Sequence, residues 1–179
     1  KKGLFVYKVR LFLCAQCRFC IATSSGLFTL ASAFVVPIVA TNFLPPYAMY
    51  CLSCRDLFLP RLCWFKGKNR FLNFKELLSP PVGIGTIQHS YDRLDIKVIE
   101  NTSEELKSIV EEMLARLDGT LEYSKEDEYL QKQFRSVTAD CGQHYGAKDV
   151  VVNARIGRDF LRRYASLLPE IKKEAIRVE

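Results

Sequence analysis

The 179-residue sequence lacks the side-chain sets that mark the common hydrolytic active sites. Its two histidines, His89 and His144, are isolated in the chain, so no Ser/His/Asp set can be recognised. The acidic pair Glu104-Glu105 most simply marks a helix start, and no paired-carboxylate site stands out. Internal repeats and low-complexity segments are also absent. With 49% apolar and 26% charged residues, the composition is that of a folded globular domain. The sequence does not identify its catalytic residues.

Nucleic-acid-binding signatures are missing as well, although the charge is distributed asymmetrically. Residues 1–91 carry eleven Lys and Arg against two Asp and Glu, whereas residues 92–140 carry seven against thirteen. A basic first half suits an anionic ligand such as a nucleotide, a phosphorylated lipid or a nucleic acid. Because no RNA- or DNA-binding motif accompanies the charge, we expect no nucleic-acid partner.

The chain has no secretory leader pattern at its start, and its seven cysteines are an odd number. An unpaired thiol is disfavoured in an oxidising compartment, so we expect a cytoplasmic protein with reduced, mostly buried thiols and neither disulfide nor metal. The absence of an initiator methionine indicates a fragment or a processed chain. The alternative is a cysteine-ligated zinc or iron–sulfur protein. Its candidate ligands are Cys14, Cys17, Cys20, Cys51, Cys54, Cys141 and His144.

No charged residue occurs between Phe19 and Cys54. A transmembrane helix needs about 20 apolar residues, so a membrane-associated scaffold without catalysis is a second alternative. Small polar residues and prolines cut this run into short pieces, which favours buried strands and a short helix. The pieces predict a βαβ unit with a strand over 18–23, a turn over 24–26, a helix over 27–35 and a strand over 37–42.

The rest of the chain alternates helical and extended patterns. Helices are predicted over 7–17, 74–78, 103–117, 124–137 and 154–168, and extended segments over 56–60 and 96–100. Residues 61–70, 80–85 and 138–153 are expected to be irregular. The predicted fold class is α/β, a three-layer domain in which the strand at 96–99 joins the same parallel sheet.

The turn Thr23-Ser24-Ser25-Gly26 is the candidate ligand loop. Loops at the carboxyl ends of parallel strands hold ligands, and a helix amino terminus there attracts anions. Serine hydroxyls add donors, and Gly26 lets a phosphate approach the backbone. The structural alternative is that Ser24 or Ser25 only caps the helix. Asn42 and Arg61 follow the neighbouring strands and could assist, or could serve as a turn residue and as part of a solvated basic loop.

These residues also carry a family resemblance. The segments Cys17–Leu27 and Pro37–Asn42 resemble a bacterial family of glycosyltransferases linked to surface polysaccharide synthesis. Cys20 and Ala22 depart from the aromatic residue and the glycine expected there. The resemblance covers most of the chain in the same order, through Leu57–Trp64, Phe74–Leu78, Val98–Glu105, Glu112–Leu114 and Arg155–Leu161.

The resemblance implies the C-terminal, Rossmann-like half of a two-domain GT-B enzyme. Residues 1–168 would form the donor-binding domain, followed by a tail over 169–179, and the N-terminal acceptor half would be missing. The implied donor is a nucleotide-sugar held by Ser24, Ser25 and Gly26, with no further cofactor. The implied acceptor is a glycan or a lipid-linked glycan, consistent with peripheral association at the inner face of the membrane. This fragment alone is expected to bind rather than catalyse.

Overall fold

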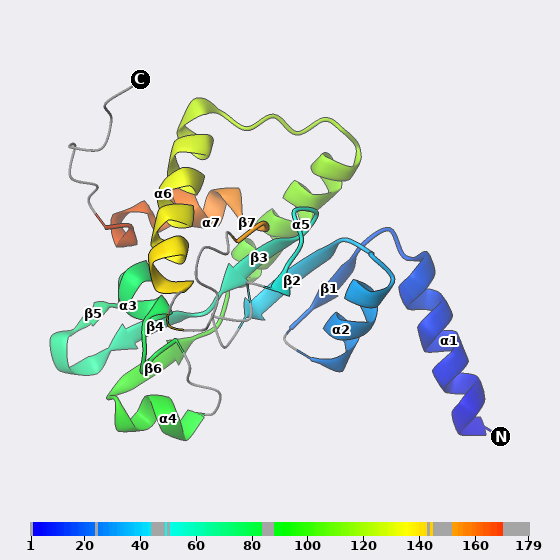
Figure 1. Cartoon of the computed structure of the whole chain (residues 1–179), viewed down its shortest axis with the longest axis horizontal. Helices are drawn as coiled ribbons and strands as arrows, with labels where there is room; N and C mark the ends of the chain where they lie inside the picture. The colour runs from blue at the N-terminus through cyan, green and yellow to red at the C-terminus, as the bar shows by residue number, and fades with distance from the viewer. Residues whose placement is uncertain are drawn as a thin grey trace.

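The computed structural model describes residues 2–23, 25–43, 49, 51–83, 88–142, 144 and 152–169. Its centre is a four-stranded parallel sheet in the order β1-β2-β3-β7 (Figure 1). The strands are β1 (Cys20–Ala22), β2 (Ile38–Phe43), β3 (Leu57–Pro60) and β7 (Arg155–Ile156). Cys20 pairs with Ile38 in parallel register, which confirms the predicted pairing of the first two strands.

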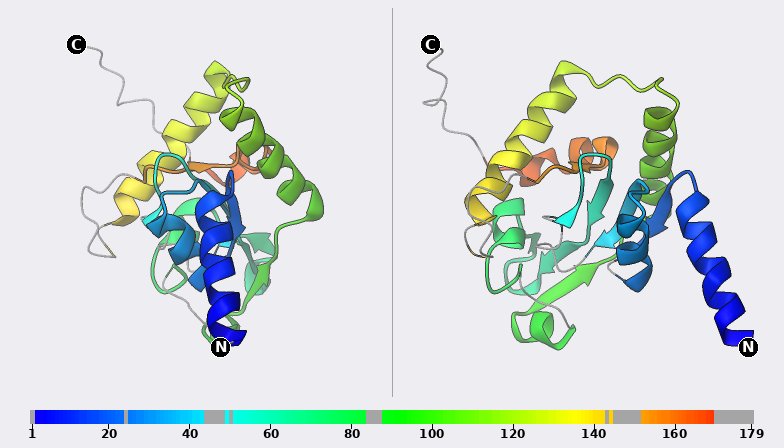
Figure 2. Two further views of the ribbon diagram at one scale, coloured as in Figure 1. Left: turned by 90° about the vertical axis from the view of Figure 1, so that its right-hand side faces the viewer. Right: turned by 45° about the vertical axis from the view of Figure 1, so that its right-hand side comes forward.

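Helices cover both faces of this sheet, so its strands are apolar almost throughout. The helices α2 (Gly26–Ala33) and α6 (Lys125–Gly142) lie on one face and α5 (Ser103–Leu117) on the other (Figure 2). Phe58 packs its ring 5.9 Å from that of Phe134 in α6. The next residue, Leu59, points to the opposite face, near Ile109 of α5. Successive side chains of β3 therefore pack against the helices on opposite faces of the sheet.

A second, antiparallel sheet has the order β5-β4-β6, with β4 (Leu62–Phe65), β5 (Arg70–Phe71) and β6 (Ile96–Ile99). The prediction that residues 96–99 join the parallel sheet is therefore wrong, as is the prediction of an irregular loop over 61–70. One residue after β3 the chain continues as β4, and β6 pairs with β4, Leu62 opposite Ile99. The place beside β3 is taken by β7 instead. An apolar run predicts a strand but does not identify its partner.

The C-terminal segment differs from the prediction in two ways. Helix α6 extends to Gly142, into a region expected to be irregular. The helix predicted over 154–168 is shorter: α7 spans Arg158–Arg163, and a 3-10 turn spans Ala165–Leu167. Ile156 is buried in strand β7 instead, and Gly157 separates strand from helix. A Cβ at Gly157 would lie 2.9 Å from Cδ2 of Leu59, so a larger residue here would force the Leu59 side chain to shift.

The remaining helices are α1 (Lys2–Gln16), α3 (Phe74–Leu78) and α4 (Gln88–Arg93). Helices α3 and α5 have the predicted bounds, whereas α4 was not expected. The uncharged run is divided into β1, α2 and β2, which confirms the predicted division. None of the helices in the described ranges has the length and apolarity that crossing a membrane requires. The linker residues beyond Gly83 and the tail beyond Pro169 lie outside the described residues.

Candidate functional site

The carboxyl ends of β1, β2 and β3 form one edge of the parallel sheet. Thr23, Asn42 and Arg61 each lie at or directly after one of these ends. The parallel register brings them to the same edge, together with the amino end of α2 (Figure 1). The edge thus presents the predicted residues from three neighbouring strands.

The amino end of α2 is open to solvent. Ser25 is its N-cap residue, with extended φ and ψ of −141° and 174°, but its side chain makes no capping hydrogen bond. The first turn contains no acidic residue. Thr23, Ser25 and Gly26 are exposed, and a Cβ built on Gly26 would meet nothing within 4 Å. Ser24 lies outside the described residues. The turn therefore leaves space and backbone N–H donors for a ligand.

Two other helices show the opposite arrangement. Thr102 caps α5 by accepting a hydrogen bond from the Glu105 N–H, and the Glu105 carboxylate accepts one from the Thr102 N–H at 2.9 Å. Asn73 and Glu76 close α3 by the same capping box. In both helices a carboxylate of the chain occupies the position where an anion would bind. Among the described residues, α2 has no such carboxylate in its first turn.

Asn42, the second-to-last residue of β2, has the left-handed conformation, with φ of 49°. Its backbone N–H donates to Oδ1 of Asn101 at 2.6 Å, and its own Oδ1 accepts from the Asn101 N–H at 2.8 Å. Asn101 also donates through Nδ2 to the carbonyl of Pro60 at 3.0 Å. These bonds clamp the ends of β2 and β3 to the start of α5, which fits the turn interpretation. The Nδ2 group of Asn42 takes no part in them.

Arg61 lies at the same junction. Its Nη2 is 3.2 Å from Oε1 of Glu100, which immediately precedes Asn101. Its Nε is buried and has no hydrogen-bond partner within the described residues. The guanidinium therefore holds a positive charge at the sheet edge with one donor still to be satisfied. Arg70, by contrast, is committed to Glu76 through two bonds of 2.7 Å, which hold the pKa of that carboxyl below its usual value.

The cysteines were the alternative site. Four of the seven are buried, as expected for most of them, and all seven are free thiols in the structure. Burial raises the pKa of Cys63 to about 12, so this thiol stays protonated at neutral pH. In the part of the chain that the structure describes, no group of three or more His, Cys, Asp or Glu residues is placed to hold a metal ion.

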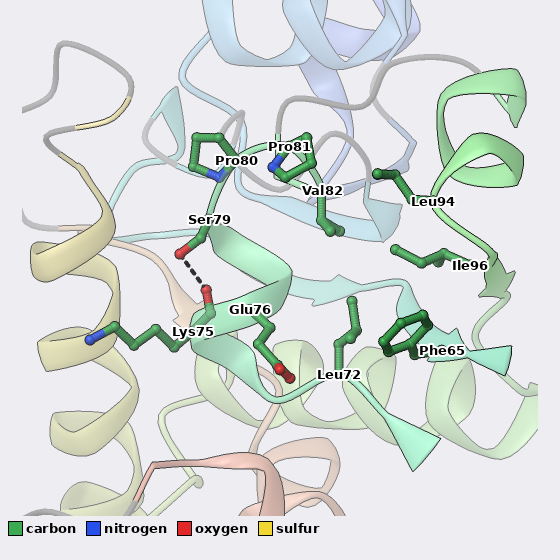
Figure 3. A pocket seen from close by; sticks show the side chains of 10 residues that line it. All are labelled: Phe65, Leu72, Lys75, Glu76, Ser79, Pro80, Pro81, Val82, Leu94 and Ile96. Atoms are coloured by element: carbon green, nitrogen blue, oxygen red, sulfur yellow. Dashed lines mark hydrogen bonds between the residues drawn. The ribbon is translucent and has the colours of Figure 1, made fainter. Parts of the chain in front are cut away.

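A cavity of about 470 Å³ lies away from the sheet edge, between the antiparallel sheet and α3 (Figure 3). Its walls are mainly apolar, with Phe65, Leu72 and Ile96 on one side. Ser79 donates its hydroxyl to the Lys75 carbonyl at 2.6 Å, and Lys75 points away from the apolar side chains. The cavity suits an apolar group and lacks the free donors that a diphosphate needs.

Sequence reasoning missed the burial of three acids on α5 and α6, each of which has its own partners. Asp127 accepts two bonds from Arg162, at 2.6 and 2.9 Å, and one from the N–H of Ser124, the residue before α6. Burial raises the pKa of Glu112, which accepts from the Arg158 N–H at 2.7 Å and from the Tyr123 hydroxyl. The third acid is Glu105. The spacing of Ser124 and Asp127 is a capping signature that could have located one of these acids.

Asn101 was missed for another reason. Its partner Asn42 is 59 positions away, so no local pattern indicates the pair.

No model of a known protein family, no characterised protein and no solved structure matches the chain.

Proposed function

We propose that this chain binds the diphosphate of a nucleotide-sugar at the amino end of α2. The observation that carries the proposal is the first turn of α2, which has no acidic residue and no side-chain cap from Ser25, next to the carboxyl ends of three parallel strands. Capping boxes close the equivalent ends of α3 and α5. An open helix end at this edge of an α/β sheet is a favourable place for an anion.

The chemistry that follows is stabilisation of a leaving group. When a sugar leaves a nucleotide diphosphate, negative charge grows on the phosphate oxygens. The N–H groups from Gly26 onward and the Ser25 hydroxyl would donate to these oxygens. Arg61 would add charge from the next strand but one. Because such donors are fixed before the reaction, each can be worth about 3 kcal/mol of barrier reduction.

The wider role that we propose is the donor half of a cytoplasmic glycosyltransferase. A parallel sheet with helices on both faces suits the Rossmann-like C-terminal half of a GT-B enzyme, and the family resemblance supports that assignment. The acceptor, a glycan or a lipid-linked glycan, and the catalytic base would then belong to a second half. Transfer to such an acceptor would serve surface polysaccharide synthesis.

The test is calorimetric titration with UDP, GDP and their sugar conjugates. We expect Gly26→Val to weaken binding at least tenfold, because its side chain would fill the space where a phosphate approaches the backbone. Ala33→Val is the matched control, since Ala33 is exposed in the last turn of the same helix and should bind as wild type does. Equal binding by wild type and Gly26→Val, or no binding by wild type, would contradict the proposal.

A further inference from the structure

Exposed apolar side chains gather in one part of the molecule. Eight large hydrophobic residues are exposed among those described, and six of them lie within residues 9–35. Helix α1 carries three: Val9 is 39%, Phe12 65% and Leu13 59% exposed. The other three are Ile21, Phe34 and Val35. Scattered single hydrophobic residues are ordinary on a surface, but a concentration of this kind indicates an interaction site.

The three residues on α1 share one helical face. Their spacing of three and four positions places them along a single stripe, here called the outer stripe: Val9, Phe12 and Leu13. Cys14, outside this stripe, is buried, and α1 packs against α2. Figure 1 shows α1 at the rim of the molecule, and all three side chains of the outer stripe are exposed there.

Basic residues border the outer stripe on both sides. Lys8 lies one turn before Phe12 on one border, and Arg10 lies one turn before Leu13 on the other. Both side chains are exposed. The first 55 residues of the chain contain six basic residues and no acidic one. Apolar and cationic groups therefore meet on this surface with no acidic residue from the same segment to neutralise them.

We propose that the outer stripe, with Lys8 and Arg10, docks on the surface of an anionic lipid bilayer. Phe12 and Leu13 would enter the boundary between headgroups and acyl chains, with the axis of α1 in the membrane plane. Lys8 and Arg10 would lay their aliphatic stems along the apolar side chains and reach the lipid phosphates.

Lipid is favoured over a protein partner by the charge on both borders. The cores of protein interfaces are depleted in lysine, and a protein would have to supply acidic groups along each side of α1. An anionic bilayer supplies them over its whole surface. The outer stripe also shares no residue with the proposed donor site. If that site is correct, docking would bring it to the membrane that carries a lipid-linked acceptor.

The test is co-sedimentation with phosphatidylcholine vesicles, with and without phosphatidylglycerol. We expect wild type to bind only the anionic vesicles. Phe12→Ser combined with Leu13→Ser should weaken binding at least tenfold, and Lys8→Gln or Arg10→Gln about fivefold each. Tyr129→Ser is the matched control: Tyr129 is 55% exposed on α6, and its loss should leave binding unchanged.

Two results would overturn the proposal: failure of wild type to bind anionic vesicles, or unchanged binding by the double serine variant. Self-association that this variant abolishes, without vesicle binding, would assign the outer stripe to a second copy of the chain instead. Far-ultraviolet circular dichroism checks that each variant is folded. Nucleotide titration of the double variant should match wild type, so failure here and failure of the donor site can be told apart.

Discussion

Two regions of the molecule differ in how far their charged and polar groups are satisfied within the chain. One is the segment from α1 to β2, and the other comprises the C-terminal helices α5, α6 and α7. In the C-terminal helices, buried carboxylates accept hydrogen bonds from backbone N–H groups at helix ends, from tyrosine hydroxyls and from an arginine of the same chain. In the first segment, the first turn of α2 contains no carboxylate, and basic residues border exposed apolar ones on α1. A region whose polar groups are satisfied internally holds the fold together. A region that leaves them unsatisfied is available to a ligand or a surface.

The largest expected effect comes from removing one of the buried carboxylates of the C-terminal helices. Asp127→Ala should lower the free energy of unfolding by about 2 to 3 kcal/mol, because it removes the carboxylate that accepts from the Ser124 N–H and both bonds to Arg162. Urea denaturation measures the change. Glu126→Ala is the control, since Glu126 is exposed in the same first turn and should cost about 0.5 kcal/mol or less.

Acid should reduce the difference between wild type and Asp127→Ala. Burial alone would raise the pKa of Asp127, but the Ser124 N–H and Arg162 outweigh it and hold this pKa below its usual 3.8. A depressed folded-state pKa gives stability that is present above the usual value and lost as the pH falls through the lower one. Parallel unfolding curves with a constant gap down through that window would contradict this account.

A smaller effect compares the two kinds of helix end directly. Thr102→Ala should destabilise the protein by about 1 kcal/mol, because Thr102 accepts the capping bond from the Glu105 N–H. Ser25→Ala should change stability by less than about 0.5 kcal/mol, since the Ser25 side chain makes no such bond. Thermal unfolding of the two variants side by side is sufficient. Equal losses would mean that Ser25 caps α2 after all.

The part of the fold that could be predicted rests on local signals. Thr102 and Glu105 form a capping box within four residues, and the apolar spacing behind them fixes α5. The βαβ unit follows from short apolar runs separated by a turn and a proline. The pairing of β4 with β6 could not be predicted, because Leu62 and Ile99 meet only after the intervening chain has folded back.

The residues of the candidate site likewise fall into those that local signals predict and those that depend on distant contacts. Ser25 and Gly26 could be placed at a helix start from their neighbours alone. The clamp between Asn42 and Asn101 could not, because reciprocal hydrogen bonds between distant loops leave no periodic trace in the sequence. The environment of Arg61 depends on Glu100, a residue that reaches the sheet edge only through β6. Tertiary contacts thus decide which predicted ligands keep a free donor.

The smallest change in stability gives the sharpest test of the comparison, because it closes the open end of α2. Ser25→Asp should stabilise the protein by about 0.5 kcal/mol, since the backbone of Ser25 is already extended as an N-cap and aspartate both caps the helix and complements its dipole. The same carboxylate would occupy the anion position and repel a diphosphate, so nucleotide affinity should fall at least tenfold. Ser25→Asn caps without the charge and should keep more of the affinity. If Ser25→Asp is stabilised yet binds nucleotide as well as wild type, the phosphates do not bind at the amino end of α2.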